Sequence, residues 1–231
     1  KGGIGLRGPG ETQLETDRRL IARRVKFIKE RLSRVAVSRG VQSRTRKRAR
    51  VRTVALVGYT NAGKSTLFNR LTRERVYAAD QLFATLDTTL RRVHVPGADP
   101  VVLSDTVGFI RDLPHDLVAA FRATLSEAAE ADLVVHVVDA SAPDRDVQVQ
   151  AVERVLAEIG ADQVPQLTVL NKIDAANLAP GVERDAYGTI RTVRLSALTG
   201  EGCAGLVSAL AERFPAGPAR ADDAAAVGSM P

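Results

Sequence analysis

The sequence holds a single cysteine, Cys203, and this excludes an internal disulfide. No second cysteine or histidine stands at metal-ligand spacing beside it, so no zinc site is indicated. Runs of eighteen apolar residues are also lacking, and the longest apolar stretches, 53–58 and 133–138, have the length of strands. These absences argue against a disulfide scaffold and a membrane-spanning helix, and they favour a protein of the reducing cytoplasm.

Near Lys1 there is no apolar stretch with a small-residue cleavage site, so no secretory signal is visible, and we expect this start to be a cut within a longer chain. The length of 231 residues and the hydrophobic share of 45% predict one main domain with an extra element beside it. From residue 215 to 231 the composition is rich in Ala, Gly, Pro and Asp, which predicts a linker or disordered tail.

The net charge of +6 divides unevenly along the chain. Residues 1–52 carry 17 Lys and Arg against 4 Asp and Glu, a net of +13, whereas residues 53–231 carry 16 against 23, a net of −7. A solvated, Arg-rich helix is the ordinary explanation of such a run. The charge density here favours a nucleic-acid partner instead, because each neutralised phosphate releases condensed counterions.

The basic segment begins with residues 1–10, half of which are glycine, and this predicts a loop. From Glu11 onward apolar residues recur at spacings of three and four, which predicts one long amphipathic helix: Leu14, Ile21, Val25, Ile28, Leu32 and Val35. Its narrow apolar seam needs a partner helix. We therefore expect residues 1–52 to be a glycine-rich loop and basic helical segment, the remnant of an N-terminal domain.

Beyond residue 52 strand-like and helix-like stretches alternate. Strands are predicted near 52–57, 90–95, 100–105, 133–139, 166–170 and 190–195, and helices near 64–72, 115–130, 145–159 and 203–213. This alternation predicts a mostly parallel six-stranded sheet with helices on both faces over residues 53–214. The turn at 96–99 joins the second and third strands as a hairpin, so one antiparallel edge strand is expected.

A glycine-rich loop links the first predicted strand to the first predicted helix, and its residues are Gly58, Tyr59, Thr60, Asn61, Ala62, Gly63, Lys64 and Ser65. A strand, such a loop and a helix in succession form the context that identifies a phosphate-binding P-loop. Backbone amides would surround the phosphates, Lys64 would neutralise the β and γ groups, and Ser65 would offer a hydroxyl to Mg²⁺. The sequence thus predicts an α/β fold of the P-loop NTPase type, preceded by the long basic helix.

A short motif follows the apolar strand at 101–103, namely Asp105, Thr106, Val107 and Gly108. Asp105 would hold Mg²⁺ through a water, and the Gly108 amide would sense the γ-phosphate, so that this turn changes shape on hydrolysis. Small GTPases of the Ras type place a glutamine next to orient the attacking water, whereas this chain has Phe109. Hydrolysis is therefore expected to be slow alone, or to depend on backbone, a cation or a partner.

Two more motifs follow later strands. In the first, which comprises Asn171, Lys172, Ile173 and Asp174, Asp174 would accept two hydrogen bonds that guanine donates and adenine does not, while the Lys172 stem covers the base. In the second, Ser196, Ala197 and Leu198, a backbone amide would meet the guanine oxygen. Four motifs in this order, each at the carboxyl end of a strand, predict GTP and GDP as ligands.

Two assignments stay open on the residues alone. The carbonyl of Asn61 lies where some GTPases hold K⁺ against the phosphates, but an equally good explanation is that Asn61 stabilises the turn of the loop. The segment 73–92 must contain the first switch, which needs one threonine for Mg²⁺ and the γ-phosphate. Thr85, Thr88 and Thr89 all qualify by residue type.

The chain resembles the HflX family of translation-factor-related GTPases from residue 2 to about residue 214. The residues that carry the resemblance are the leader 2–13, the segment 58–69, the Phe83, Ala84, Thr85, Leu86 and Asp87 motif, and the segments 105–110 and 113–117. The resemblance implies Thr85 as the switch threonine and a second Mg²⁺ ligand beside Ser65. Thr88 stands where the family usually has proline, which would loosen the end of the switch.

The resemblance further implies binding to the ribosome, principally the large subunit and its RNA, with splitting or rescue of stalled ribosomes and hydrolysis stimulated by the ribosome. Catalytic roles then fall to Lys64, Thr85, Asp105 and Gly108. We expect a cytoplasmic monomer that reaches the ribosome through its basic segment. Two alternatives remain: a nucleotide-gated binding module with negligible turnover, which Phe109 motivates, and a GTPase that acts on a target other than the ribosome.

Overall fold

The computed structural model describes residues 15–16, 18–20, 23, 51–72, 89–106, 108 and 127–216. Six of these belong to the predicted basic helix, and all six are helical and exposed: Glu15, Thr16, Arg18, Arg19, Leu20 and Arg23. The remainder of that predicted helix, its proposed partner seam and the tail from residue 217 lie outside the described residues.

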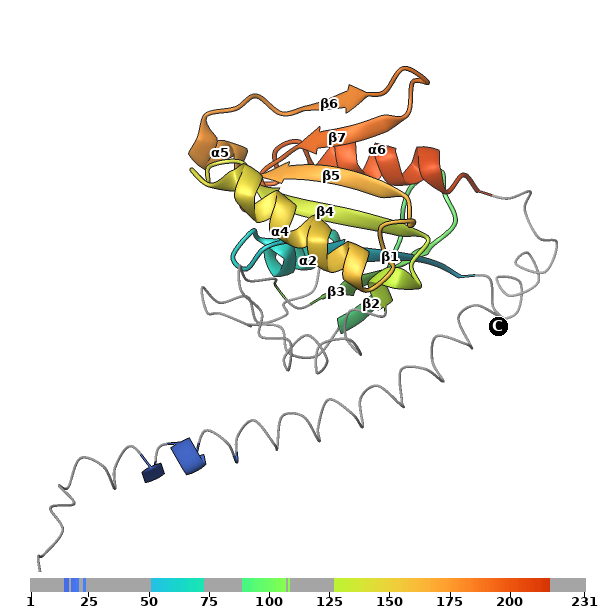
Figure 1. The fold of residues 1–231 in the computed structure, drawn as a ribbon. Helices are drawn as coiled ribbons and strands as arrows, with labels where there is room; N and C mark the ends of the chain where they lie inside the picture. The colour runs from blue at the N-terminus through green and yellow to red at the C-terminus, as the bar shows by residue number, and fades with distance from the viewer. Residues whose placement is uncertain are drawn as a thin grey trace, which may run out of the picture.

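The described part of the chain from residue 51 onward is organised around a seven-stranded sheet (Figure 1). Its strands are β1 (Arg52–Val57), β2 (Thr89–Val93), β3 (Val101–Asp105), β4 (Leu133–Asp139), β5 (Gln166–Asn171), β6 (Gly181–Arg184) and β7 (Ile190–Arg194). They lie in the order β2-β3-β1-β4-β5-β7-β6. The five central strands are parallel, while β2 and β6 run antiparallel at the two edges.

The mostly parallel sheet and the antiparallel edge strand β2 are confirmed, but the predicted number of six strands is wrong by one. The missed strand is β6, which has only four residues and none that is fully buried. It pairs with β7 through the turn at 185–189 and contains a register shift at its end. A short, exposed edge strand with one large apolar residue shows no apolar pattern, and its existence depends on the neighbour with which it pairs.

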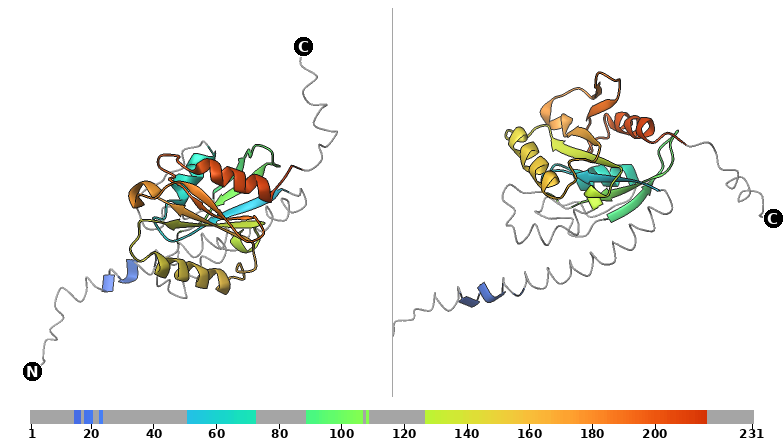
Figure 2. Two further views of the ribbon diagram at one scale, coloured as in Figure 1. Left: turned by 90° about the horizontal axis from the view of Figure 1, so that it is seen from above. Right: turned by 45° about the vertical axis from the view of Figure 1, so that its right-hand side comes forward.

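Helices cover both faces of the sheet, as predicted. The structure contains α2 (Lys64–Thr72), α4 (Arg145–Glu158), the single-turn α5 (Ile173–Ala176) and α6 (Cys203–Arg213). Figure 2 shows α4 on one side of the strands and α2 with α6 on the other. The predicted helix at 115–130 lies outside the described residues except for its end, where residues 127–129 are helical.

The two faces form two separate apolar cores, because successive side chains of a strand point to opposite sides of a sheet. On β1, Val54 and Leu56 join the core beneath α2 and α6, whereas Ala55 and Val57 join the core beneath α4. A central strand buried on both faces explains the continuous apolar run that precedes the glycine-rich loop. Within the parts of the chain that the structure describes, no helix combines the length and the apolar character needed to cross a membrane.

Candidate functional site

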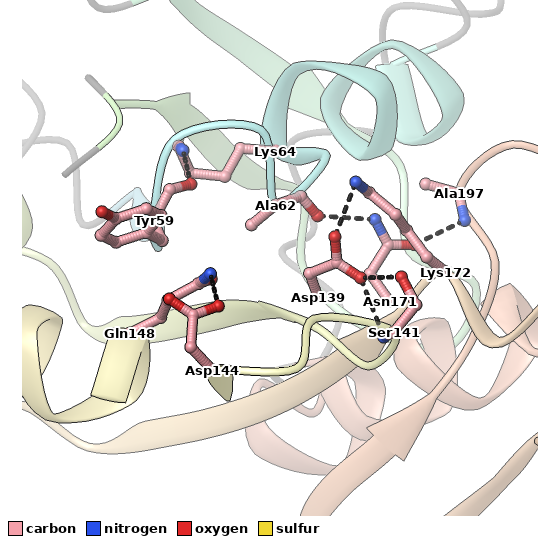
Figure 3. Close-up of polar contacts among 10 residues, drawn as sticks. All are labelled: Tyr59, Ala62, Lys64, Asp139, Ser141, Asp144, Gln148, Asn171, Lys172 and Ala197. Carbon is pink, nitrogen blue, oxygen red and sulfur yellow. Dashed lines mark hydrogen bonds and ion pairs between the residues drawn. The ribbon is translucent and has the colours of Figure 1, made fainter. Parts of the chain in front are cut away.

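The predicted site residues converge at one edge of the sheet because their strands are parallel and end in register. Leu56 of β1 pairs with Asp105 of β3, and Asp139 of β4 pairs with Asn171 of β5. The loops that follow these strands therefore meet at the carboxyl edge, which is where open α/β sheets bind their ligands. Figure 3 shows contacts among the loops that follow β1, β4, β5 and β7.

The glycine-rich loop turns sharply because three of its residues, Gly58, Asn61 and Gly63, have a positive φ. Gly58 has a φ of 151°, and a Cβ atom there would lie 2.2 Å from the carbonyl oxygen of Val137 in β4. Asn61 has a φ of 60°, in the left-handed region that asparagine tolerates better than most residues. Glycine at position 58 lets β1 and β4 stay adjacent while the chain leaves the sheet.

Lys64 begins α2 and folds back over the loop that precedes it. Its Nζ donates to the carbonyl oxygens of Gly58, at 3.1 Å, and Tyr59, at 2.9 Å. Burial lowers the pKa of Lys64 to about 8, although the nearby charge of Asp105 acts in the opposite direction. The ammonium group is thus held inside the loop, where phosphate oxygens would replace the carbonyl groups as its acceptors.

His136 of β4 lies beneath this loop and is almost fully buried. Burial, and then the positive charge of Lys64, lower the pKa of His136 to about 4. The imidazole is therefore neutral at physiological pH.

Ser65 and Asp105, predicted to serve a metal ion, are brought together. The Ser65 hydroxyl donates to Oδ2 of Asp105 at 2.8 Å, and the Asp105 side chain is completely buried at the end of β3. Hydroxyl and carboxylate oxygens are the hard donors that Mg²⁺ prefers, so these two residues fit such an ion. Beside them, the hydroxyl of Thr106 donates to the carbonyl oxygen of Leu56 at 2.6 Å and ties the turn to β1.

Gly108 follows this turn and lies against the glycine-rich loop. A Cβ atom at position 108 would come within 2.8 Å of the Thr60 side chain and 3.1 Å of the Lys64 Nζ. The backbone at 108 therefore reaches the part of the loop where a terminal phosphate would lie.

Asn171 connects the glycine-rich loop with the loop after β7. Its Nδ2 donates to the carbonyl oxygen of Ala62, and its Oδ1 accepts from the backbone N–H of Ala197, both at 2.8 Å. The side chain is nearly fully buried. One amide group thus fixes the distance between the predicted phosphate site and the predicted base site (Figure 3).

The predicted base site is completed by residues on either side of Asn171. Ile173 is buried and anchors α5, while Asp174 is exposed in the first turn of the same helix. Ser196 is buried, and its hydroxyl accepts from the N–H of Thr199 at 3.1 Å, which keeps the turn closed. Leu198 extends into solvent from the same turn.

Two residues that the sequence did not single out also take part. Arg70 of α2 donates to the carbonyl oxygen of Ala197 at 3.1 Å and to that of Leu198. Asp139, at the end of β4, forms an ion pair with Lys172 at 2.7 Å. A polar residue ending the apolar run 133–138 was a signal for Asp139, whereas Arg70 looks like any exposed helical arginine.

Several predicted residues lie outside the described residues: the switch motif Phe83, Ala84, Thr85, Leu86 and Asp87, and also Val107 and Phe109. Their assignments stay predictions. Among the residues that the structure does describe, no group of three or more His, Cys, Asp or Glu side chains is arranged to hold a metal ion.

A glycine-rich loop closed by a lysine, a serine paired with a buried aspartate, and an asparagine that spans to a second loop are the marks of a P-loop GTPase domain. A family model described as 50S ribosome-binding GTPase matches residues 53–172, just over half of the chain. A second model, the GTP-binding GTPase Middle Region, matches residues 1–46.

Curated relatives and a solved structure agree with these matches. The GTPase HflX of Escherichia coli is 58% identical over 93% of this chain and 50% of its own length, and that of Caldanaerobacter subterraneus is 52% identical over 80% and 44%. A GTP-binding protein from Sulfolobus solfataricus in complex with GDP is 26% identical, with a TM-score of 0.57 over 82% of this chain and 66% of that protein. The chain belongs to the HflX family of GTPases. It spans about half the length of the curated relatives.

Proposed function

We propose that this chain binds GTP and GDP at the carboxyl edge of its sheet and hydrolyses GTP slowly by itself. The observation that supports this most directly is the double contact of Asn171, which holds the predicted phosphate loop and the predicted guanine loop at one distance. A site in which these two loops are held together suits a ligand that carries a base at one end and phosphates at the other.

In this proposal the residues act as follows. Residues 58–65 surround the phosphates, and Lys64 neutralises them with its buried ammonium group. Ser65 and Thr85 hold Mg²⁺ directly and Asp105 holds it through water; the bound ion would withdraw charge from the phosphate oxygens. The backbone amide of Gly108 donates a hydrogen bond to the γ-phosphate. Asp174 accepts two hydrogen bonds from guanine, and the loop of Ser196, Ala197 and Leu198 offers a backbone amide to the guanine oxygen.

We further propose that Asn61 contributes to a K⁺ site against the phosphates. Its exposed position in the loop leaves the residue accessible to an ion. The left-handed backbone at Asn61 agrees equally with the alternative that this residue serves the turn alone. A monovalent cation would place positive charge beside the γ-phosphate, where negative charge develops during hydrolysis.

The proposed partner is the ribosome, principally its large subunit and its RNA, and the proposed outcome is the splitting or rescue of stalled ribosomes. Support comes from the name of the matching family model and from the net charge of +13 on residues 1–52. A basic segment of this density binds polyanions through counterion release. We propose that residues 1–52 and 53–214 act as separate units of a cytoplasmic monomer, the first binding RNA and the second binding nucleotide.

The competing proposal is a nucleotide-gated binding module with negligible turnover. It draws on Phe109, which stands where Ras-type GTPases have the glutamine that orients water. A hydrophobic side chain there can neither donate nor accept a hydrogen bond, so it cannot orient the attacking water.

Phosphate release from GTP separates the two proposals. We expect slow release by the chain alone, faster release with ribosomes or isolated large subunits, and a further increase in K⁺ over Na⁺. If ribosomes leave the rate unchanged while nucleotide still binds, the binding module is the better description. Equal rates in K⁺ and Na⁺ would assign Asn61 to the turn alone.

Co-sedimentation with ribosomes at several salt concentrations tests the basic segment. We expect binding in the GTP-bound state, a fall in affinity as salt rises, and loss of binding when Lys and Arg residues of the segment are replaced by Gln. Salt-insensitive binding that survives these substitutions would contradict the proposed role of residues 1–52.

A further inference from the structure

We propose that Asp139 is a positioning residue of the nucleotide site, which holds Lys172 in the orientation needed to cover the guanine base. The inference rests on the proposed function, because it assigns Asp139 to the binding of the same nucleotide. Neither the motif that contains Lys172 nor any other sequence motif described above includes Asp139.

The central contact is an ion pair between two side chains that are largely withdrawn from solvent. Lys172 Nζ lies 2.7 Å from Oδ2 of Asp139, and the two side chains are 30% and 16% exposed, respectively. The other carboxylate oxygen, Oδ1, accepts from the backbone N–H of Ser141 at 2.9 Å and from its hydroxyl at 2.6 Å. Asp139 is therefore held on one oxygen and holds Lys172 with the other (Figure 3).

Sheet register explains why this contact forms. Asp139 and Asn171 are paired residues at the ends of β4 and β5, so the residue after Asn171 emerges beside the carboxylate. The N–H of Ala140 donates to the carbonyl oxygen of Asn171 at 2.8 Å and prevents the two chain ends from separating. Asp139 is thus a fixed point on the rigid sheet and not part of a free loop.

The backbone conformation of Lys172 does not by itself fix the orientation of its side chain, so an anchor such as Asp139 is needed. The residue has a φ of 63° and a ψ of 37°, a left-handed conformation that places it at the start of α5. A lysine side chain with four rotatable bonds loses considerable entropy when it is held in one orientation. An ion pair formed before the nucleotide arrives removes that cost from the binding step.

The charge state of Asp139 agrees with this role. Burial acts to raise the pKa of its carboxyl group, but hydrogen bonds from Lys172 and Ser141 outweigh burial and hold the pKa below its usual value. The carboxylate therefore stays ionised at physiological pH, and the ion pair is present throughout the neutral range.

Because the Lys172 stem covers the face of the base, the expected effect falls on affinity and dissociation, not on turnover. The test is stopped-flow measurement of fluorescent GDP and GTP on the full chain with Asp139→Asn, Lys172→Met and both together. We expect Asp139→Asn to raise Kd roughly five- to tenfold, mainly through faster dissociation, and to leave kcat at saturating GTP unchanged. In the Lys172→Met background, Asp139→Asn should have no further effect.

Two more variants make the test independent of folding. Ser141→Ala removes an exposed hydroxyl that anchors Asp139, and it should weaken binding roughly twofold. Asp146→Asn removes the same charge from a side chain that is 84% exposed on α4, and it should bind like the wild type.

The possible results separate this inference from the proposed function. Wild-type protein that binds guanine nucleotides, together with Asp139→Asn protein that binds them equally well, would overturn the role of Asp139 alone. Additive effects of Asp139→Asn and Lys172→Met would also overturn it, because Asp139 would then act independently of the lysine. Wild-type protein that binds no guanine nucleotide would overturn both proposals.

Discussion

The side-chain amide of Asn171 donates to the carbonyl oxygen of Ala62 at 2.8 Å across 109 residues of sequence. A buried hydrogen bond of this kind couples the folding of the loop after β1 to that of β5.

Replacing Asn171 with alanine should destabilise the nucleotide-free protein by roughly 2 to 4 kcal/mol, because Ala62 and Ala197 would each lose a buried partner. Denaturant unfolding measures this change. Asn171→Asp keeps an acceptor for Ala197 but places a buried carboxylate oxygen against the carbonyl oxygen of Ala62, so it should destabilise the nucleotide-free protein at least as much as alanine does. Equal stability of Asn171→Ala and wild type would contradict the proposed connection.

Nucleotide affinity should fall as the pH rises above about 8. Burial lowers the pKa of Lys64 to about 8 in the free protein, so the ammonium group loses its proton above that pH. Bound phosphates favour the charged form and raise this pKa, so binding takes up a proton. Affinity for GDP should therefore drop by at most roughly tenfold per pH unit.

Titration calorimetry at pH 9 in two buffers of different ionisation enthalpy measures this proton uptake directly. Lys64→Met should bind GDP weakly and show no such uptake. Uptake that persists in Lys64→Met would assign the proton to another group.

Acid should destabilise the fold through His136. The pKa of His136 is lowered to about 4 by burial and by Lys64, whereas an unfolded histidine titrates near 6.5. Between these values the unfolded state binds more protons, so stability is complete above pH 6.5 and is lost as the pH falls toward 4. The loss amounts to about 3 kcal/mol at most.

Unfolding measured from pH 7.5 to 4.5 tests this dependence. His136→Phe should flatten the profile, while His94→Gln, at an exposed position after β2, should leave it unchanged. A profile that keeps its full slope in His136→Phe would refute the assignment.

Arg70 should support nucleotide binding from outside the sequence motifs. Its guanidinium donates to the carbonyl oxygens of Ala197 and Leu198, and Gly200 lies against it. Arg70→Ala should raise Kd for GDP roughly fivefold, a modest effect because the side chain is exposed. Arg154→Ala on the exposed face of α4 is the matched control, and fluorescence titration of GDP compares the two. An equal Kd for both variants would leave Arg70 without a role in binding.

Much of the fold can be predicted from the sequence, because each pattern that indicates a strand, loop or helix lies within a few neighbouring residues. The run Val54–Val57 is apolar throughout, as expected of a strand buried on both faces, and a glycine and a lysine then mark the loop and the helix that follow. Five of the six predicted strands agree with the structure to within one residue at each end, and the sixth, predicted near 90–95, begins at Thr89 and ends two residues early at Val93. The strand β6 was missed because its four residues are mostly exposed and include a single large apolar side chain, and because its stability comes from pairing with β7.

The motifs around Lys64, Asp105 and Asn171 were likewise visible in the sequence, because glycine, lysine and aspartate at these spacings have few other uses. What the sequence left undetermined is which side chains meet: that Asp139 holds Lys172, that Asn171 joins Ala62 to Ala197, and that Arg70 reaches the same loop. These contacts join residues far apart in the chain, and they depend on strand order and register. Residue types alone determined the kind of site, and the tertiary structure decided its partners, because register is set by the packing of the whole sheet.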